Sequence, residues 1–209
     1  NVSTETATVL VVDTIDPLVI CKNVTLFLGS TGSATIVASD IDNGSSDNCS
    51  NITFSASQTS FTCSDLGQNS VTLTVTDAYG NSDSCTATVT VYDLIAPVAN
   101  CKPDTIYLNG SGVATLAASD IDNGSTDNCS VSLNITQTTF NCSDIGANTV
   151  TLTASDIQGL SSTCTTTVTV LDTFAPIVSC QPITVNLDAS GIATITAADV
   201  DNGSSDNCT

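Results

Sequence analysis

Aspartate is concentrated in one ten-residue phrase that occurs three times in the 209 residues. The phrase is DIDNGSSDNC at 40–49, DIDNGSTDNC at 120–129 and DVDNGSSDNC at 199–208. Among the 21 acidic residues only Glu5 is glutamate, whereas a surface charged only for solubility has no reason to favour one acid. Short carboxylates with a glycine turn suit Ca2+, which takes about 6–8 oxygen ligands. The phrase therefore predicts a calcium site in each copy.

The strands around each phrase must bring further carboxylates to it. In an immunoglobulin-type sandwich the first strand leaves the incoming linker and the second returns to it. The linker, the phrase and the end of the penultimate strand then share one pole. The predicted ligands are Asp13, Asp40, Asp42, Asp47 and Asp77 in the first copy, Asp93, Asp120, Asp122, Asp127 and Asp156 in the second, and Asp172, Asp199, Asp201 and Asp206 in the third.

The alternative interpretation is a loop rich in Asx turns that holds no ion. The phrase is not an EF-hand, because it lacks the downstream glutamate of that loop. Asp16 is a weaker candidate ligand, since Ala96 and Ala175 stand at its counterparts. Asp65 and Asp144, in CSDLG and CSDIG, are interpreted as ordinary turn residues at the opposite pole.

The apolar residues recur with a period of two, which is typical of strands rather than helices. Val71, Leu73 and Val75 alternate with threonines, and 86–91 repeats the pattern. Residues 34–38 and 52–56 also alternate. Six or seven short strands separated by turn signals predict an all-β fold, an antiparallel immunoglobulin-like sandwich. Threonine ladders also occur on ice-binding surfaces, but solvent-facing strand positions explain them more simply.

The whole sequence follows the register of the phrase, with a period of about 80 residues. VVDTIDPLVIC, ending at Cys21, matches the segments ending at Cys101 and Cys180. We therefore predict tandem repeats joined end to end, as a slice of a longer array. The predicted domains are residues 1–13 (the last strand of a preceding repeat), 14–93, 94–172 and 173–209 (the first part of a third repeat).

Each complete repeat carries four cysteines at matching places, which predicts two disulfides per repeat and an oxidising, extracellular location. They are Cys21, Cys49, Cys63 and Cys85, then Cys101, Cys129, Cys142 and Cys164. A zinc site is the rival hypothesis, but the spacings are long and the chain contains no histidine. Small modules need such covalent or metal staples.

Charge and hydropathy exclude several partners. The formal net charge is −19, with Lys22 and Lys102 as the only basic residues, so nucleic acid is not expected. No apolar run approaches the length of a membrane span, so no membrane insertion is expected in this segment.

The frame V-x-D-x-x-x-P-x-x-x-C, then A-T-x-x-A-x-D-x-D-N-G-S-x-D-N-C, then T-D-x-x-G-N and C-T-x-T-V-T-V-x-D resembles the hyaline repeat (HYR) family and its bacterial relatives. The resemblance implies tandem immunoglobulin-like modules of large secreted surface adhesins, notably of Bacteroidota, such as the gliding-motility adhesins of the SprB type. Two positions depart from the frame: Leu160 replaces the asparagine of G-N, and Glu5 replaces a cysteine.

In a module of this type the first and last strands both start at the linker pole. Cys21 is then expected to pair with Cys85 and Cys101 with Cys164, which leaves Cys49–Cys63 and Cys129–Cys142, and leaves Cys180 and Cys208 without partners in this chain. The alternative, first cysteine with second, would join Cys180 to Cys208; four cysteines allow three pairings. Bacterial relatives are also often O-glycosylated at Asp-Ser/Thr-apolar triplets, which makes Thr14 and Thr105 candidates.

The function expected from these features is structural: a stalk or filament segment of a secreted cell-surface adhesin, with calcium-stiffened joints between its repeats. Neighbouring repeats of the same chain are its expected partners, with surface glycans or other adhesin chains as further candidates. The alternative is a carbohydrate- or protein-binding module acting through its loops. An enzyme is not expected, because the chain has no histidine and no nucleophile motif.

Overall fold

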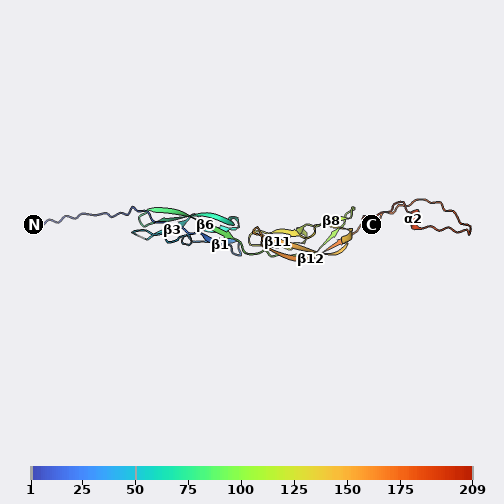
Figure 1. The fold of residues 1–209 in the computed structure, drawn as a ribbon, viewed down its shortest axis with the longest axis horizontal. Helices are drawn as coiled ribbons and strands as arrows, with labels where there is room; N and C mark the ends of the chain where they lie inside the picture. Colours follow the sequence, from blue (N-terminus) through green and yellow to red (C-terminus); the bar gives the residue numbers. More distant parts are fainter. Residues whose placement is uncertain (1, 50, 209) are drawn as a thin grey trace. The chain divides into compact units, whose positions relative to one another are not determined.

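The computed structural model describes residues 2–49 and 51–208, and the chain forms two compact units, Asn1–Ile95 and Ala96–Thr209 (Figure 1). Both units are all-β and have the same order of elements. In the first unit these are β1 (Val24–Phe27), β2 (Ser33–Thr35), the 3-10 turn η1 (Ala38–Asp40), β3 (Thr53–Ala56), β4 (Ser60–Thr62), the 3-10 turn η2 (Cys63–Asp65), β5 (Gly67–Thr76) and β6 (Ser82–Tyr92).

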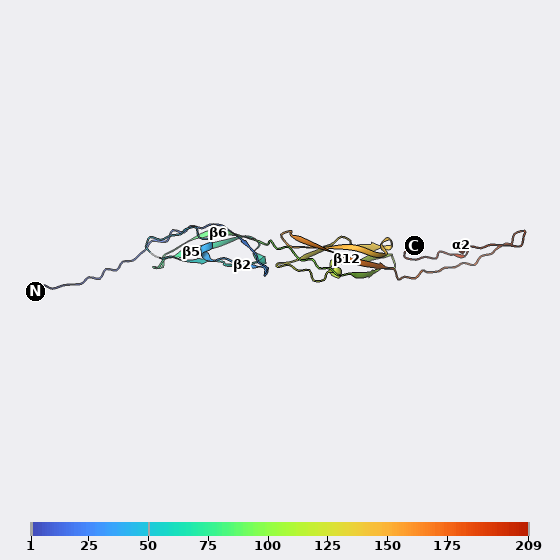
Figure 2. The same ribbon diagram turned by 90° about the horizontal axis from the view of Figure 1, so that it is seen from below.

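The larger sheet of the first unit has the strand order β1-β6-β5-β3. Its long central hairpin pairs β5 with β6 from Gly67 opposite Val91 to Thr76 opposite Ser82 (Figure 2). Strand β1 at the edge runs parallel to β6, with Val24 opposite Val89. The sheet is therefore antiparallel except at this edge, because β1 and β6 start at the same end of the unit.

The second layer consists of the antiparallel pair β2–β4 and two isolated bridges, Leu18 to Ser46 and Cys21 to Asp42. The bridges attach the segment before β1 to the acidic phrase. Two further hydrogen bonds reinforce them: Ile20 N donates to Ser45 Oγ (3.0 Å), and Asn43 N donates to Ile20 O (2.8 Å). The D-N-G-S part of the phrase thus fastens the entering chain to the unit.

The second unit repeats this arrangement with β7 (Asp104–Tyr107), β8 (Val113–Thr115), the short helix α1 (Ala118–Ile121), β9 (Ser132–Ile135), β10 (Thr139–Asn141), η3 (Cys142–Asp144), β11 (Gly146–Ser155) and β12 (Ser161–Leu171). Its sheet order is β7-β12-β11-β9, with β8 paired to β10. The parallel edge recurs, since Val168 of β12 lies opposite Asp104 of β7.

The core lies between the two layers and is formed by the apolar residues of the predicted alternating pattern. In β5, Val71, Leu73 and Val75 are fully buried while the threonines between them are half-buried, so a period of two correctly indicates the inward face. Each unit also buries one phenylalanine completely, Phe61 in β4 and Phe140 in β10. The fold class predicted from the pattern is thus confirmed at the level of an all-β sandwich.

The predicted alternating strand at 34–38 is wrong in its second half. Strand β2 ends at Thr35, and Ala38–Asp40 form a 3-10 turn. The reason is local: Asp40 Oδ2 accepts a hydrogen bond from Val37 N (2.8 Å) and caps the turn.

Residues 173–208 belong to the second compact unit and contain one short helix, α2 (Ala197–Val200). Their bridges, Ile177 to Ser205 and Cys180 to Asp201, match those of the two units described above. Ile183, Val185 and Ile195 are exposed in this segment.

Candidate metal site

Three of the five predicted ligands in the first unit come together. Asp13 lies on the entering segment, Asp47 in the acidic phrase, and Asp77 directly after β5. One carboxylate oxygen from each lies within 4.8 Å of the other two. Asp77 is buried (6% exposed), and the other two are half-buried.

The turn after β5 holds this cluster in place. Asp77 Oδ1 accepts hydrogen bonds from Tyr79 N (2.9 Å) and Asn81 N (2.8 Å), and Asp77 Oδ2 accepts one from Asn81 Nδ2 (2.8 Å). The same amide lies 3.2 Å from Asp13 O. Burial opposes ionisation of Asp77, but these hydrogen bonds outweigh it and lower its pKa below the ordinary value. Asn81 therefore links the entering segment to an ionised Asp77.

Asp13 Oδ2 is buried and accepts no hydrogen bond from any residue that the structure describes. A buried carboxylate oxygen without a partner is costly, and the cost is greater beside two further carboxylates. An oxygen-only donor set of this kind fits a hard divalent cation such as Ca2+. Asp13, Asp47 and Asp77 are the residues that would hold it.

Asp40 and Asp42 have a different role from the cluster residues, because their carboxylate oxygens accept hydrogen bonds from nearby backbone amides. Asp40 caps η1, and Asp42 accepts hydrogen bonds from Gly44 N (3.1 Å) and Ser45 N (3.0 Å). Their counterparts do the same: Asp120 accepts from Ala117 N, Asp122 from Ser125 N and Oγ, Asp199 from Thr196 N, and Asp201 from Ser204 N. Asp42, Asp122 and Asp201 thus form Asx-type turns, and Asp40, Asp120 and Asp199 cap the short helical turns that precede them.

In the second unit Asp127 and Asp156 each have a buried oxygen, Asp127 Oδ1 and Asp156 Oδ2, with no hydrogen-bond partner in the described part of the chain. Asp156 is 8% exposed, and Leu160 N donates to its Oδ1 (2.8 Å). Leu160 has no amide to offer Oδ2. Asp93, the predicted linker ligand, is buried at the end of the first unit, and Ile95 N donates to its Oδ1 (3.0 Å).

The third acidic phrase contacts the chain at the end of β12. Asn207 Nδ2 lies 3.1 Å from Asp172 Oδ1 and 3.2 Å from Asn109 O, and Asp206 is half-buried beside it in the sequence. The sequence did not single out Asn207. The signal was the repeated asparagine before each phrase cysteine, at positions 48, 128 and 207.

The disulfides agree with half of the expected pairing. Cys21 is bonded to Cys85 and Cys101 to Cys164, as expected from strands that start at one pole. The expected Cys49–Cys63 and Cys129–Cys142 bonds are wrong. Cys142 is bonded to Cys208, and Cys49 is a free thiol among the described residues. Cys63 and Cys129 are also disulfide-bonded.

The reason for the error is the position of the η3 turn. Cys142 lies on η3 at the end of the unit opposite the acidic phrase of its own repeat, where the third phrase arrives. Cys208 was expected to have no partner and has one. The alternative bond from Cys180 to Cys208 is also absent, since Cys180 remains a free thiol.

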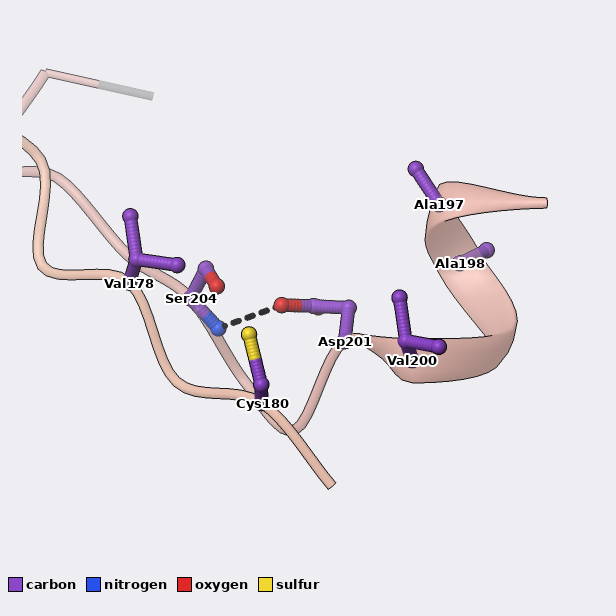
Figure 3. A pocket seen from close by; sticks show the side chains of 7 residues that line it. All are labelled: Val178, Cys180, Ala197, Ala198, Val200, Asp201 and Ser204. Atoms are coloured by element: carbon purple, nitrogen blue, oxygen red, sulfur yellow. Dashed lines mark hydrogen bonds between the residues drawn. The ribbon is translucent and has the colours of Figure 1, made fainter. Parts of the chain in front are cut away.

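A shallow hollow lies beside Cys180 (Figure 3), where Ser204 N donates to Asp201 Oδ1 (3.0 Å). The lining residues are Val178, Cys180, Ala197, Ala198, Val200, Asp201 and Ser204. The counterpart Cys101 is bonded to Cys164 of β12, a strand that 173–208 lacks. Apolar side chains form most of the lining of the hollow, and Asp201 is already bonded to Ser204.

The two candidate glycosylation residues are both accessible. Thr14 is exposed on the entering segment, and Thr105 is exposed on edge strand β7. None of the helices in the described ranges is long and apolar enough to cross a membrane.

No model of a known protein family matches the chain, and no curated protein does. Solved structures similar to it include human mucin-like protocadherin EC1-2 (11% identity, TM-score 0.40, 75% of this chain and 98% of that one) and mouse cadherin-23 EC22-24 (15%, 0.38, 75% and 65%). Another is an endo-fucoidan hydrolase from glycoside hydrolase family 107 (19%, 0.32), of which the chain covers 29%.

Proposed function

We propose that this chain is a structural segment of an extracellular adhesin, a stalk or filament built from disulfide-stapled repeats whose joints are stiffened by calcium. The observation that carries the proposal is the cluster of Asp13, Asp47 and Asp77, with its buried, unpartnered Asp13 Oδ2. The cluster joins the chain that enters the unit to two loops of the unit itself. A cation bound there would fix the direction in which each repeat leaves the one before it.

Calcium fits the cluster better than magnesium. Three carboxylates on three separate segments form an irregular set, and Ca2+ tolerates variable geometry and accepts additional backbone carbonyls and waters. Mg2+ requires near-ideal octahedral geometry and keeps most of its waters. Loss of the cation would leave three carboxylates within 4.8 Å repelling one another, which favours release of the entering segment.

Repetition of the cluster residues supports a structural role over a catalytic one. The residues Asp93, Asp127 and Asp156 occupy the corresponding sequence positions, and Asp172 and Asp206 begin a third set. A catalytic pair gains nothing from a copy at each repeat, whereas a joint must recur at every boundary. The lopsided charge of −19 also suits a surface array that must not associate with itself without a cation.

Calcium titration of the whole chain by isothermal calorimetry tests the proposal. Asp47→Asn should remove one calcium equivalent, and Asp83→Asn, which changes an exposed aspartate of β6 outside the cluster, should leave the stoichiometry unchanged. Small-angle scattering with and without chelator should show greater flexibility after calcium removal. Identical titrations for the two variants, or no heat at millimolar calcium, would contradict a calcium site.

A further inference from the structure

The Cys142–Cys208 disulfide joins two different repeats. Cys142 is the first residue of the η3 turn in the second repeat, and Cys208 closes the acidic phrase of the third. Their sequence separation is 66 residues. Unlike Cys21–Cys85 and Cys101–Cys164, this bond does not close a loop within one sandwich.

The surroundings of this bond accommodate it closely. A Cβ atom at Gly112, whose φ is +70°, would lie 2.7 Å from Cys142 Sγ and 2.7 Å from Asn207 O. Only glycine leaves room there for both the sulfur and the incoming backbone. Asn207 Nδ2 then binds Asn109 O (3.2 Å) on the same turn as Gly112.

The first unit carries the same turn. Cys63 begins η2, and its Sγ lies 3.5 Å from Gly32 O, as Cys142 Sγ lies 3.8 Å from Gly112 O. Gly32 has a φ of 68°, close to that of Gly112. Cys63 is disulfide-bonded, and so is Cys129, the phrase cysteine of the second repeat.

Cys49 is the phrase cysteine of the first repeat and is an exposed free thiol. It matches Cys208 position for position, since each closes the sequence D-N-G-S-S-D-N-C. It also lies beside the cluster, since its backbone N donates to Asp47 Oδ2 (3.1 Å).

We propose that Cys49 is a cross-linking site that takes the cysteine of a C-S-D-[Leu/Ile]-G turn on another repeat, so that successive repeats form a covalently linked series. The partner is a second copy of the turn that Cys142 presents. The bond is independent of any cation, so it can be tested whether or not the calcium site exists.

Bond formation requires a disulfide oxidant, such as oxidised glutathione or a protein disulfide. The Cys49 thiolate attacks one oxidant sulfur and releases the other as a thiol, which gives a mixed disulfide. The turn cysteine's thiolate then attacks Cys49 Sγ and releases the second thiol. Two protein thiols are thereby oxidised by two electrons, and the oxidant disulfide is reduced to two thiols.

Freeing Cys142 supplies the partner for a test. Cys208→Ser breaks the existing bond, Asn207→Ala removes its hydrogen bonds to Asn109 and Asp172, and Cys180→Ser removes the other free thiol. This triple variant is mixed in 14N and 15N forms and equilibrated in a glutathione redox buffer. The control is the same variant with Cys49→Ser.

The expected result is a covalent dimer that is lost in the control, with a Cys49–Cys142 peptide carrying both isotopes by mass spectrometry. Monomers bearing glutathione on Cys49 and Cys142 would overturn the proposal, because both thiols would then be reactive but not matched. Dimers joined only through Cys49–Cys49 would overturn the proposal as well, because Cys49 would then pair with another exposed thiol and not with the cysteine of the turn.

Discussion

Asp77 and Asp156 occupy the same place in the two units but have different neighbours. Each follows the long strand of the hairpin and is more than nine-tenths buried. Asn81 donates its side-chain amide to Asp77 Oδ2, whereas Leu160 leaves Asp156 Oδ2 without a partner in the described residues. The backbone bond to Oδ1 is the same in both, 2.8 Å from residue 81 or 160.

The difference shows that the turn tolerates loss of the amide while the carboxylate remains. Asp77 has its hydrogen bonds within the protein, so its turn is held before any cation arrives. Asp156 depends on something else to satisfy Oδ2, and a cation is the partner its charge favours. We therefore expect the second unit to respond more strongly to calcium than the first.

Each unit encloses a fully buried phenylalanine of its own, so removing that ring should destabilise that unit strongly and leave the other unit unchanged. Phe61→Ala should lower the free energy of unfolding of the first unit by about 3–5 kcal/mol, and Phe140→Ala should do so for the second, because each ring is fully buried. Calorimetry should show one shifted transition in each variant. A shift of both transitions by either substitution would show that the two units do not unfold independently.

Exchanging residues 81 and 160 tests whether this position determines how each unit responds to calcium, and the expected effect is of intermediate size. Asn81→Leu should lower the calcium-free melting temperature of the first unit by a few degrees, because Asp77 Oδ2 loses its donor. It should also enlarge the stabilisation that calcium gives. Leu160→Asn should change the second unit in the opposite direction. Fluorescence-monitored melting with and without calcium measures both, and equal responses in all variants would show that residue 81 does not tune the site.

The smallest expected effect is a change in the pKa of the aspartates that form turns within the acidic phrase. Hydrogen bonds from Ser125 lower the pKa of Asp122 below 3.8; in the first unit burial opposes ionisation of Asp42, but bonds from Ser45 and Gly44 still lower its pKa. Because the folded pKa is depressed, this stabilisation is present above about pH 4 and is lost as the pH falls through the folded value. Ser125→Ala should raise the Asp122 pKa toward 3.8 in an NMR titration. An unchanged pKa would assign the shift to the backbone amides alone.

The sequence predicted the layers and the meeting of three carboxylates at one pole because both follow from local pattern. Alternation identified the buried face of β5, and the turn between strands placed Asp13, Asp47 and Asp77 together. It did not separate this cluster from Asp40 and Asp42, because a carboxylate that caps a turn and one that faces other carboxylates have the same residue type. Their distinction depends on backbone direction, which the phrase alone does not specify.

The disulfides show a second feature that could be predicted only in part from the sequence. Cys21–Cys85 follows from strand direction within one sandwich, and strand direction was predictable. Cys142–Cys208 depends on how one repeat meets the next, and a search for partners inside each repeat could not find it. Its sequence signal was present as the glycine at 112, which is required where a sulfur and a backbone carbonyl approach together.

The Cys21–Cys85 bond also decides how the first unit carries a pulling force. Tension that enters through the segment before Cys21 crosses the sulfur bridge to Cys85 in β6 and continues along β6 to Tyr92. The chain between the two cysteines lies outside this load path and cannot be drawn out while the bridge is intact. With a separation of 64 residues, at about 3.4 Å each, roughly 200 Å of chain stays folded away under load. The second unit has the corresponding bridge between Cys101 and Cys164, while its Cys142 is bonded outside that loop, to Cys208.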